Sequence, residues 1–250
     1  MISDPMFYAV AVPAVVMLGL AKGGLSGVGV VAMPLVAMVI PPVQAAAILL
    51  PILMIQDVVG VWAFRKTWDR QILAIMIPGS ILGIAAGYLL AAKVSGDAVL
   101  GFLGAISIVF ALHRLWVSRG GRVQAPANAP PWVGAIFGAL SGFTSQIAHA
   151  GGPPFQMWVM PRGLSPASLV GTTAIFFFAI NWLKVPAYMA LGQFTRANMM
   201  TAAALAPVAI ASTFAGVWVI RRIEPARFYQ IIYLVMVPMG GYLIWKALAG

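Results

Sequence analysis

Ionisable side chains inside apolar stretches are the first candidates for chemistry in this chain. Lys22 lies deep within an apolar stretch, Asp57 and Lys184 lie inside two longer ones, and His149 follows a fourth. Because an unpaired charge among apolar groups is costly, each of these residues needs a partner or a ligand. We expect Lys22 to contact an anionic substrate, unless its side chain extends to a membrane surface. His149 could bind the anion, carry a coupled proton or pack as a neutral side chain.

Asp57 and Lys184 allow two interpretations. Buried charges of opposite sign usually pair, so the first is a salt bridge between these two residues. Asn181 lies one helical turn before Lys184 and would join this group. In the second interpretation, Asp57 is the carboxylate whose proton or sodium ion drives transport.

Two glycine-rich stretches, residues 19–29 and 142–154, predict breaks in helices. Irregular backbone within a bilayer persists only where it is buried in protein or lines a wet cavity. A helix that begins after such a break points N–H groups at the gap, which favours an anion there, and Pro153 suits its first turn. The candidate substrate-binding residues are Lys22, Gly23, Gly24, Ser26, Gly27, Gly29, Ser145, Gln146, His149, Gly151, Gly152, Thr172 and Thr173.

The hydroxyl and amide groups in this set also have structural explanations. Ser26, Ser145 and Gln146 could donate hydrogen bonds to an anion, but a serine can instead bond to its own helix. Thr172 and Thr173 could line a cavity or hydrogen-bond between helices.

The composition is that of a membrane protein. Of the 250 residues, 62% are hydrophobic and 8% are charged, whereas soluble domains carry roughly a quarter charged residues. The net charge of +10 comes from Lys and Arg scattered between apolar segments, which indicates topology signals and no nucleic-acid partner. The absence of cysteine excludes disulfides, and no cluster has the spacing of a metal site.

Apolar segments fill the chain and predict an all-α polytopic fold. Six are long enough to span a bilayer, and four are short and form two adjacent pairs joined by the glycine-rich stretches. The long segments are residues 43–64, 72–92, 98–117, 166–191, 197–220 and 228–248. The short pairs are 6–21 with 28–40, and 131–147 with 153–161.

A polar linker, residues 118–131, divides this single membrane domain into two similar halves, residues 1–120 and 131–250. Matching residues recur at spacings that drift from 123 to 129, which indicates a duplication. The matched pairs are Gly19/Gly142, Gly29/Gly152, Asp57/Asn181, Arg70/Arg196, Pro78/Pro207, Gly87/Gly216 and Trp116/Trp245.

The relative orientation of the halves depends on the short pairs. If each pair is a re-entrant hairpin, the repeats are inverted; if each is one broken spanning helix, they are parallel. The inverted arrangement leaves only Lys93, Arg196 and Lys246 on one face and most other Lys and Arg on the opposite face, which is the stronger positive-inside bias. As a helix, segment 153–161 would extend about 13 Å, well short of the bilayer core. We therefore favour inverted repeats, with both termini outside the cytoplasm.

Taken together, the twin glycine-rich motifs, Gly151-Gly152-Pro153 and Gly171-Thr172-Thr173 resemble the TauE/SafE family of sulfite-exporter permeases over nearly the whole chain. The resemblance implies transport of a small sulfur-containing anion such as sulfite, sulfoacetate or a related organosulfonate. The family's usual number of spans agrees better with the parallel arrangement. Lys22 in the first motif and His149 before the second glycine pair depart from the family's pattern.

The sequence predicts a secondary transporter of the bacterial inner membrane that uses alternating access and a proton or sodium gradient, with no cofactor and no enzymatic activity. Its expected partners are a small anion and the lipid bilayer, and a homodimer is one option. The alternatives are a passive anion channel, an intramembrane enzyme built on His149 and Asp57, or a structural subunit of a larger complex.

Overall fold

Helices make up nearly all of the structure, a computed structural model that describes residues 1–23, 28–91, 93–120, 128–219 and 226–249. No strand occurs within these ranges. The elements are α1 (Pro5–Lys22), η1 (Val28–Val31), α2 (Ala32–Ala37), α3 (Pro42–Phe64), α4 (Arg70–Ala91), α5 (Gly96–Ser118), α6 (Pro131–Ala148), α7 (Gly152–Val159), η2 (Met160–Arg162), α8 (Pro166–Ala190), α9 (Arg196–Val219) and α10 (Ala226–Ala249).

Proline and short polar residues begin many of these helices. Pro5, Pro42, Pro131 and Pro166 occupy first turns, where the missing N–H is no loss. Ser165 caps α8 by accepting a 3.2 Å hydrogen bond from the backbone N–H of Ser168. The boundaries are therefore set locally by the sequence.

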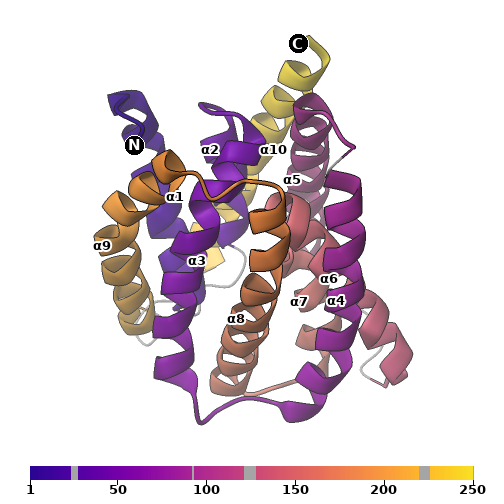
Figure 1. The fold of residues 1–250 in the computed structure, drawn as a ribbon. Coiled ribbons are helices and arrows are strands. Elements are labelled where there is room, and N and C mark those ends of the chain that lie inside the picture. Colours follow the sequence, from indigo (N-terminus) through magenta and orange to yellow (C-terminus); the bar gives the residue numbers. More distant parts are fainter. Residues whose placement is uncertain (24–27, 92, 121–127, 220–225, 250) are drawn as a thin grey trace.

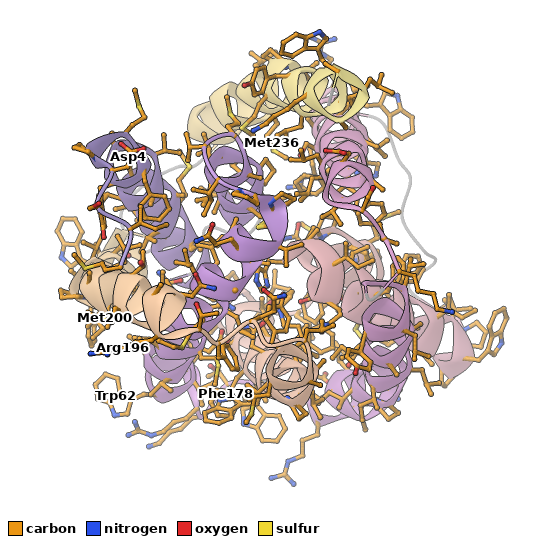
Figure 2. All side chains as sticks on the ribbon, turned by 45° about the horizontal axis from the view of Figure 1, so that its top comes forward. Asp4, Trp62, Phe178, Arg196, Met200 and Met236 are labelled. Carbon is orange, nitrogen blue, oxygen red and sulfur yellow. The ribbon has the colours of Figure 1, made fainter. Side chains whose placement is uncertain are left out.

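Six of the described helices are long and apolar enough to cross a membrane. They are Pro5–Lys22, Pro42–Phe64, Arg70–Leu90, Gly96–Val117, Pro166–Ala190 and Arg196–Trp218. Large apolar side chains such as Trp62 and Phe178 point outward from the bundle (Figure 2). The expected all-α polytopic fold is confirmed.

Both glycine-rich stretches interrupt helices, as predicted. α1 ends at Lys22 with Gly23 as its C-cap, and the next described elements are η1, from Val28, and the six-residue α2. α6 ends at Ala148 with His149 as its C-cap, and α7 is an eight-residue helix. At a rise of about 1.5 Å per residue, neither α2 nor α7 can span a bilayer.

Residue contacts fix how neighbouring helices run. Gly19 and Gly23 of α1 approach Ser212 and Gly216 of α9 in the same order, so these two helices are parallel. In the same way, α4 and α6 are parallel, because Gly79 and Gly83 of α4 approach Ala135 and Ala139 of α6.

The other two main pairs are antiparallel. Asp57 and Gly60 of α3 lie beside Asn181 and Ala174 of α8, which is the reverse order. α5 and α10 likewise pack in reverse order, since Gly101 faces Ala247 and Gly104 faces Gly240. Figure 1 shows both termini at one end of the bundle, with the α3–α4 connection and the start of α8 at the other.

The α-helices of residues 5–118 and of residues 131–249 follow one another in a similar order, although η1 precedes α2 and η2 follows α7. Each long helix of the first half runs opposite to its counterpart in the second. The duplication and the inverted arrangement of the two repeats stay predictions.

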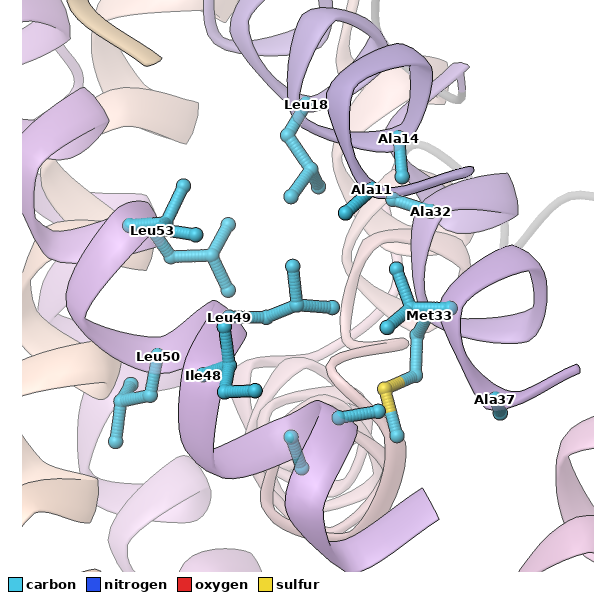
Figure 3. Packing of buried hydrophobic residues seen from close by; sticks show 14 of the residues in the cluster. Ala11, Ala14, Leu18, Ala32, Met33, Ala37, Ile48, Leu49, Leu50 and Leu53 are labelled. Atoms are coloured by element: carbon cyan, nitrogen blue, oxygen red, sulfur yellow. The ribbon is translucent and has the colours of Figure 1, made fainter. Parts of the chain in front are cut away.

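Two apolar clusters hold the short helices in place. In the first half, Leu18 of α1, Met33 of α2 and Leu49 and Leu53 of α3 pack together (Figure 3). In the second half, Phe155 and Trp158 of α7 pack against α4 and against Phe176 of α8. The short helices α2 and α7 are thus packed against protein, as backbone at membrane depth requires.

Candidate functional site: a cavity between the interrupted helices

A cavity of ≈ 80 Å³ lies where the ends of α1 and α6 meet α3, α7 and α8. By the same measure one water needs at least about 10–15 Å³, so the cavity has room for a ligand of a few non-hydrogen atoms. Its walls are Leu18, Ala21, Lys22, Gly29, Val30, Leu53, Ser145, His149, Gly152, Gln156, Thr173, Phe177 and Asn181. The two glycine-rich stretches therefore contribute to one cavity.

Lys22 is the cation of the cavity wall, and its partner is Asp57. The Lys22 ammonium donates to Asp57 Oδ1 in a salt bridge, and Asn181 Nδ2 donates to Asp57 Oδ2 at 2.6 Å. The expected Asp57–Lys184 pair is therefore wrong. The C-terminal end of α1 brings Lys22 to Asp57 on α3, whereas the hydrogen bonds of Lys184 go to Ser145 and His149.

Lys184 is fully buried and bonds to the end of α6 instead. Its Nζ lies 3.2 Å from Ser145 O, 3.1 Å from Ser145 Oγ and 2.8 Å from His149 Nδ1. All of these acceptors are neutral. Lys184 itself lies behind the cavity wall that Ser145 and His149 form.

His149 has an unusual backbone conformation for its residue type. With φ of 50°, it is the one non-glycine residue in the left-handed region among the residues described. The 3.1 Å bond from His149 N to Ser145 O and the 3.2 Å bond from Ala150 N to Thr144 O end α6 in the way that glycine usually allows. The left-handed conformation strains any residue with a Cβ, so the imidazole is held there at a cost.

Hydrogen-bond counting identifies the donors that can face a ligand. Ser145 Oγ accepts from Lys184, which leaves its own O–H free to point into the cavity. Asn181 and Lys22 each use one proton on Asp57 and keep others. Thr173 donates to Leu169 O at 2.7 Å, so its proton is already used.

Gln156 of α7 is a cavity residue that the sequence analysis missed. It is 8% exposed, lines the cavity, and its side-chain oxygen has no hydrogen-bond partner in the described part of the chain. A polar residue inside the short apolar segment 153–161 was the available signal. Its amide completes the set of polar groups around the ligand space.

Phe177 is a second cavity residue that the sequence analysis missed. The centre of its ring lies 4.8 Å from the Lys22 ammonium, and the ring forms part of the cavity wall. The contact has cation–π geometry and supports the Lys22 side chain.

Several predicted residues are in structural positions rather than on the cavity. Gly23 packs against the backbone of Gly216 on α9, and Gln146 packs against Gly87 on α4. Thr172 accepts a 2.8 Å bond from the backbone N–H of Asp69 and so holds the α3–α4 connection to α8. Gly151 accepts from the Ser141 hydroxyl at 2.6 Å. Gly24, Ser26 and Gly27 lie outside the described residues.

These features define a class: a polytopic helical membrane protein with a mainly apolar cavity between two interrupted helices, into which a few polar side chains project. The sequence model of the Sulfite exporter TauE/SafE family matches residues 11–243. The chain belongs to this family of membrane permeases, and the predicted resemblance is confirmed. No curated protein and no solved structure matches the chain.

Proposed function

We propose that this protein is a secondary transporter that moves a small sulfur-containing anion, such as sulfite, sulfoacetate or a related organosulfonate, across the inner membrane. The observation that carries the proposal is the cavity at the meeting of the two interrupted helices. It is lined by one cation, Lys22, and by neutral donors on Ser145, Gln156 and Asn181. A small oxyanion fits a space of this size that offers the Lys22 ammonium and several neutral hydrogen-bond donors.

Alternating access between the two halves is the proposed mechanism. The cavity is lined by residues at matching places in the two halves, namely Lys22 with Ser145, Gly29 with Gly152 and Leu53 with Phe177. Asp57 and Asn181, which also match, hydrogen-bond to each other directly. A site on the boundary between halves that run in opposite directions can open to either face when one half rocks against the other.

Both termini are proposed to lie on the non-cytoplasmic side. Arg65 and Lys66 are at the α3–α4 connection, and Arg162 lines a surface pocket with Asp69 of the same connection. These cations therefore lie at the end opposite to the termini (Figure 1). The positive-inside rule places that end in the cytoplasm.

Reconstitution tests the proposal. The purified protein is placed in liposomes, and uptake of sulfite, thiosulfate, sulfoacetate and taurine is measured with and without a pH or sodium gradient. We expect uptake of at least one sulfur anion and faster uptake with a gradient. Flux that ignores both gradients would favour the passive channel, and no flux of any of these compounds would refute anion transport.

The enzyme alternative has less support. It needs His149 and Asp57 to act on one substrate, but Asp57 is engaged by Lys22 and Asn181, whereas His149 bonds to Lys184 and Ala46. The geometry gives these two residues separate environments.

A further inference from the structure

Lys184 is a buried amine whose charge has no carboxylate partner among the described residues. Asp57, the acid that faces this region, is bonded to Lys22 and Asn181. The second half alone has such a group, because the residue that matches Lys184 in the first half, at a spacing of 124, is Gly60. When the cavity is empty, a protonated Lys184 would be an uncompensated buried charge, which is strongly unfavourable.

The hydrogen bonds of His149 limit how many protons this region can hold. His149 Nε2 lies 2.9 Å from the backbone oxygen of Ala46, which can only accept, so Nε2 carries a proton. Nδ1 of the neutral ring is then an acceptor facing the Lys184 amine at 2.8 Å. A second proton on the ring would point at the ammonium, so the Lys184–His149 pair carries a charge of zero or one.

Other titratable groups around Lys184 either bond to partners of their own or form no hydrogen bond with it. On α1 and α3, Lys22 and Asp57 neutralise each other. On α8 itself, Tyr188 donates to the backbone oxygen of Gln146 at 3.2 Å. On α4, which also packs against α8, Arg70 and Tyr88 form no hydrogen bond with Lys184, whose contacts are those with Ser145 and His149. The site as a whole is therefore neutral or singly positive, according to the state of Lys184.

We propose that Lys184 carries a proton that crosses the membrane with the anion, one proton for each singly charged anion. This rests on the proposed anion transport and names its coupling group. The anion binds to Lys22, Gln156 and the Ser145 hydroxyl, and a proton from water on the open side is taken up by Lys184 Nζ, which bonds to Ser145. On the other side the anion leaves and the proton returns to water.

Charge balance explains why the two must move together. The empty site with neutral Lys184 carries no net charge, and neither does the loaded site with one anion and protonated Lys184. Only these two neutral forms can reorient through the membrane without a buried net charge. A site that has bound only the anion or only the proton carries a net charge, so it cannot reorient through the membrane.

Replacing Lys184 by arginine separates coupling from binding, because arginine keeps its charge permanently. In the Lys184→Arg variant, the site has no net charge only when an anion is bound. The variant should therefore exchange external radiolabelled sulfite for internal sulfite at a rate within about threefold of the wild-type rate. Net uptake driven by an inward proton gradient should fall by about tenfold or more, because the empty, charged site cannot return. The matched control is Lys246→Arg, since Lys246 donates to the backbone oxygen of Met38 outside the cavity and should leave both activities unchanged.

Proton-driven net uptake by Lys184→Arg at the wild-type rate would overturn the proposal. If this variant loses both activities, proton uptake by the wild-type protein is measured instead. Methanesulfonate, which keeps a single negative charge, is added to the protein in weakly buffered detergent solution at several pH values from mildly acidic to alkaline. We expect uptake of about one proton per bound anion at the alkaline end. If no proton uptake, or no methanesulfonate binding, is found at any pH, the coupling role of Lys184 is refuted. If liposomes with the wild-type protein move no sulfur anion, the proposed transport function is refuted instead.

Discussion

At the residue scale, the site depends on which buried charges have partners. Lys22 and Asp57 form the salt bridge, and the fully buried Asp57 also accepts from Asn181. Removing one member of such a pair leaves an uncompensated charge, which costs about 3–5 kcal/mol, whereas removing both is much less harmful. The role of Lys22 in transport can therefore be separated from its role in stability.

Lys22→Ala should insert in the membrane but lose anion transport and unfold at a lower temperature, because Asp57 loses its cation. The double variant Lys22→Ala/Asp57→Asn should regain much of the unfolding temperature but none of the transport. Thermal unfolding in detergent and sulfite uptake in liposomes give the two readouts. Normal uptake by either variant would remove Lys22 from the anion site.

Gln156 should act on the ligand and hardly at all on stability, because its side chain lines the cavity without a hydrogen bond in the described structure, and its Nε2–H₂ group is the donor that an oxyanion needs. A hydrogen bond to a charged group contributes about 1.5–3 kcal/mol, so Gln156→Leu should raise the sulfite concentration for half-maximal uptake by roughly tenfold or more. The unfolding temperature should stay the same or rise. Gln193→Leu is the control, since Gln193 bonds to Leu191 O at the α8–α9 connection; an equal effect of both changes would contradict the assignment.

At the element scale, glycines let the two halves pack closely. A Cβ on Gly83 of α4 would lie 1.9 Å from the backbone oxygen of Ala139 on α6, and one on Gly142 of α6 would lie 2.2 Å from that of Ser80 on α4. Backbones this close allow no side chain between them, as is common for helices packed within membranes. The α4–α6 pair positions Ser145 and His149 at the cavity.

Gly83→Ala should therefore destabilise the protein by roughly 1–3 kcal/mol through overpacking. Gly241 of α10 is also within a helix, but a Cβ there meets nothing within 4 Å. Gly241→Ala should be neutral or slightly stabilising, as expected for a helix interior. Thermal unfolding of the two variants side by side tests the packing, and equal unfolding temperatures would argue against the close α4–α6 contact.

At the scale of the whole molecule, topology can be tested cleanly because the chain has no cysteine. Ser3→Cys, Leu248→Cys and Lys66→Cys each introduce a single thiol at an exposed position. In intact cells, an impermeant maleimide should label the variants at positions 3 and 248 and leave the one at 66 unlabelled until the membrane is opened. Labelling of position 66 in intact cells together with positions 3 and 248 would contradict inverted repeats, because only the parallel arrangement puts all three on one side.

Local patterns in the sequence were sufficient for the class of protein and the position of the breaks. Apolar segments of spanning length, Pro at helix starts and the glycine-rich stretches predicted the helical bundle and the interruptions near Gly23 and His149. These features depend on residues close together in the chain, which share a helix or its end. The family could be named from the same motifs.

The partners within the site were decided by the tertiary structure. Asp57 pairs with Lys22 and not with Lys184. Gln156 and Phe177 face the cavity, whereas Gln146 faces α4. Each of these outcomes depends on how a helix is rotated about its axis against its neighbours, including those from the other half. An apolar sequence carries little periodicity to fix that rotation, because nearly every face of a buried helix is apolar. Close backbone contacts between the halves fix it instead.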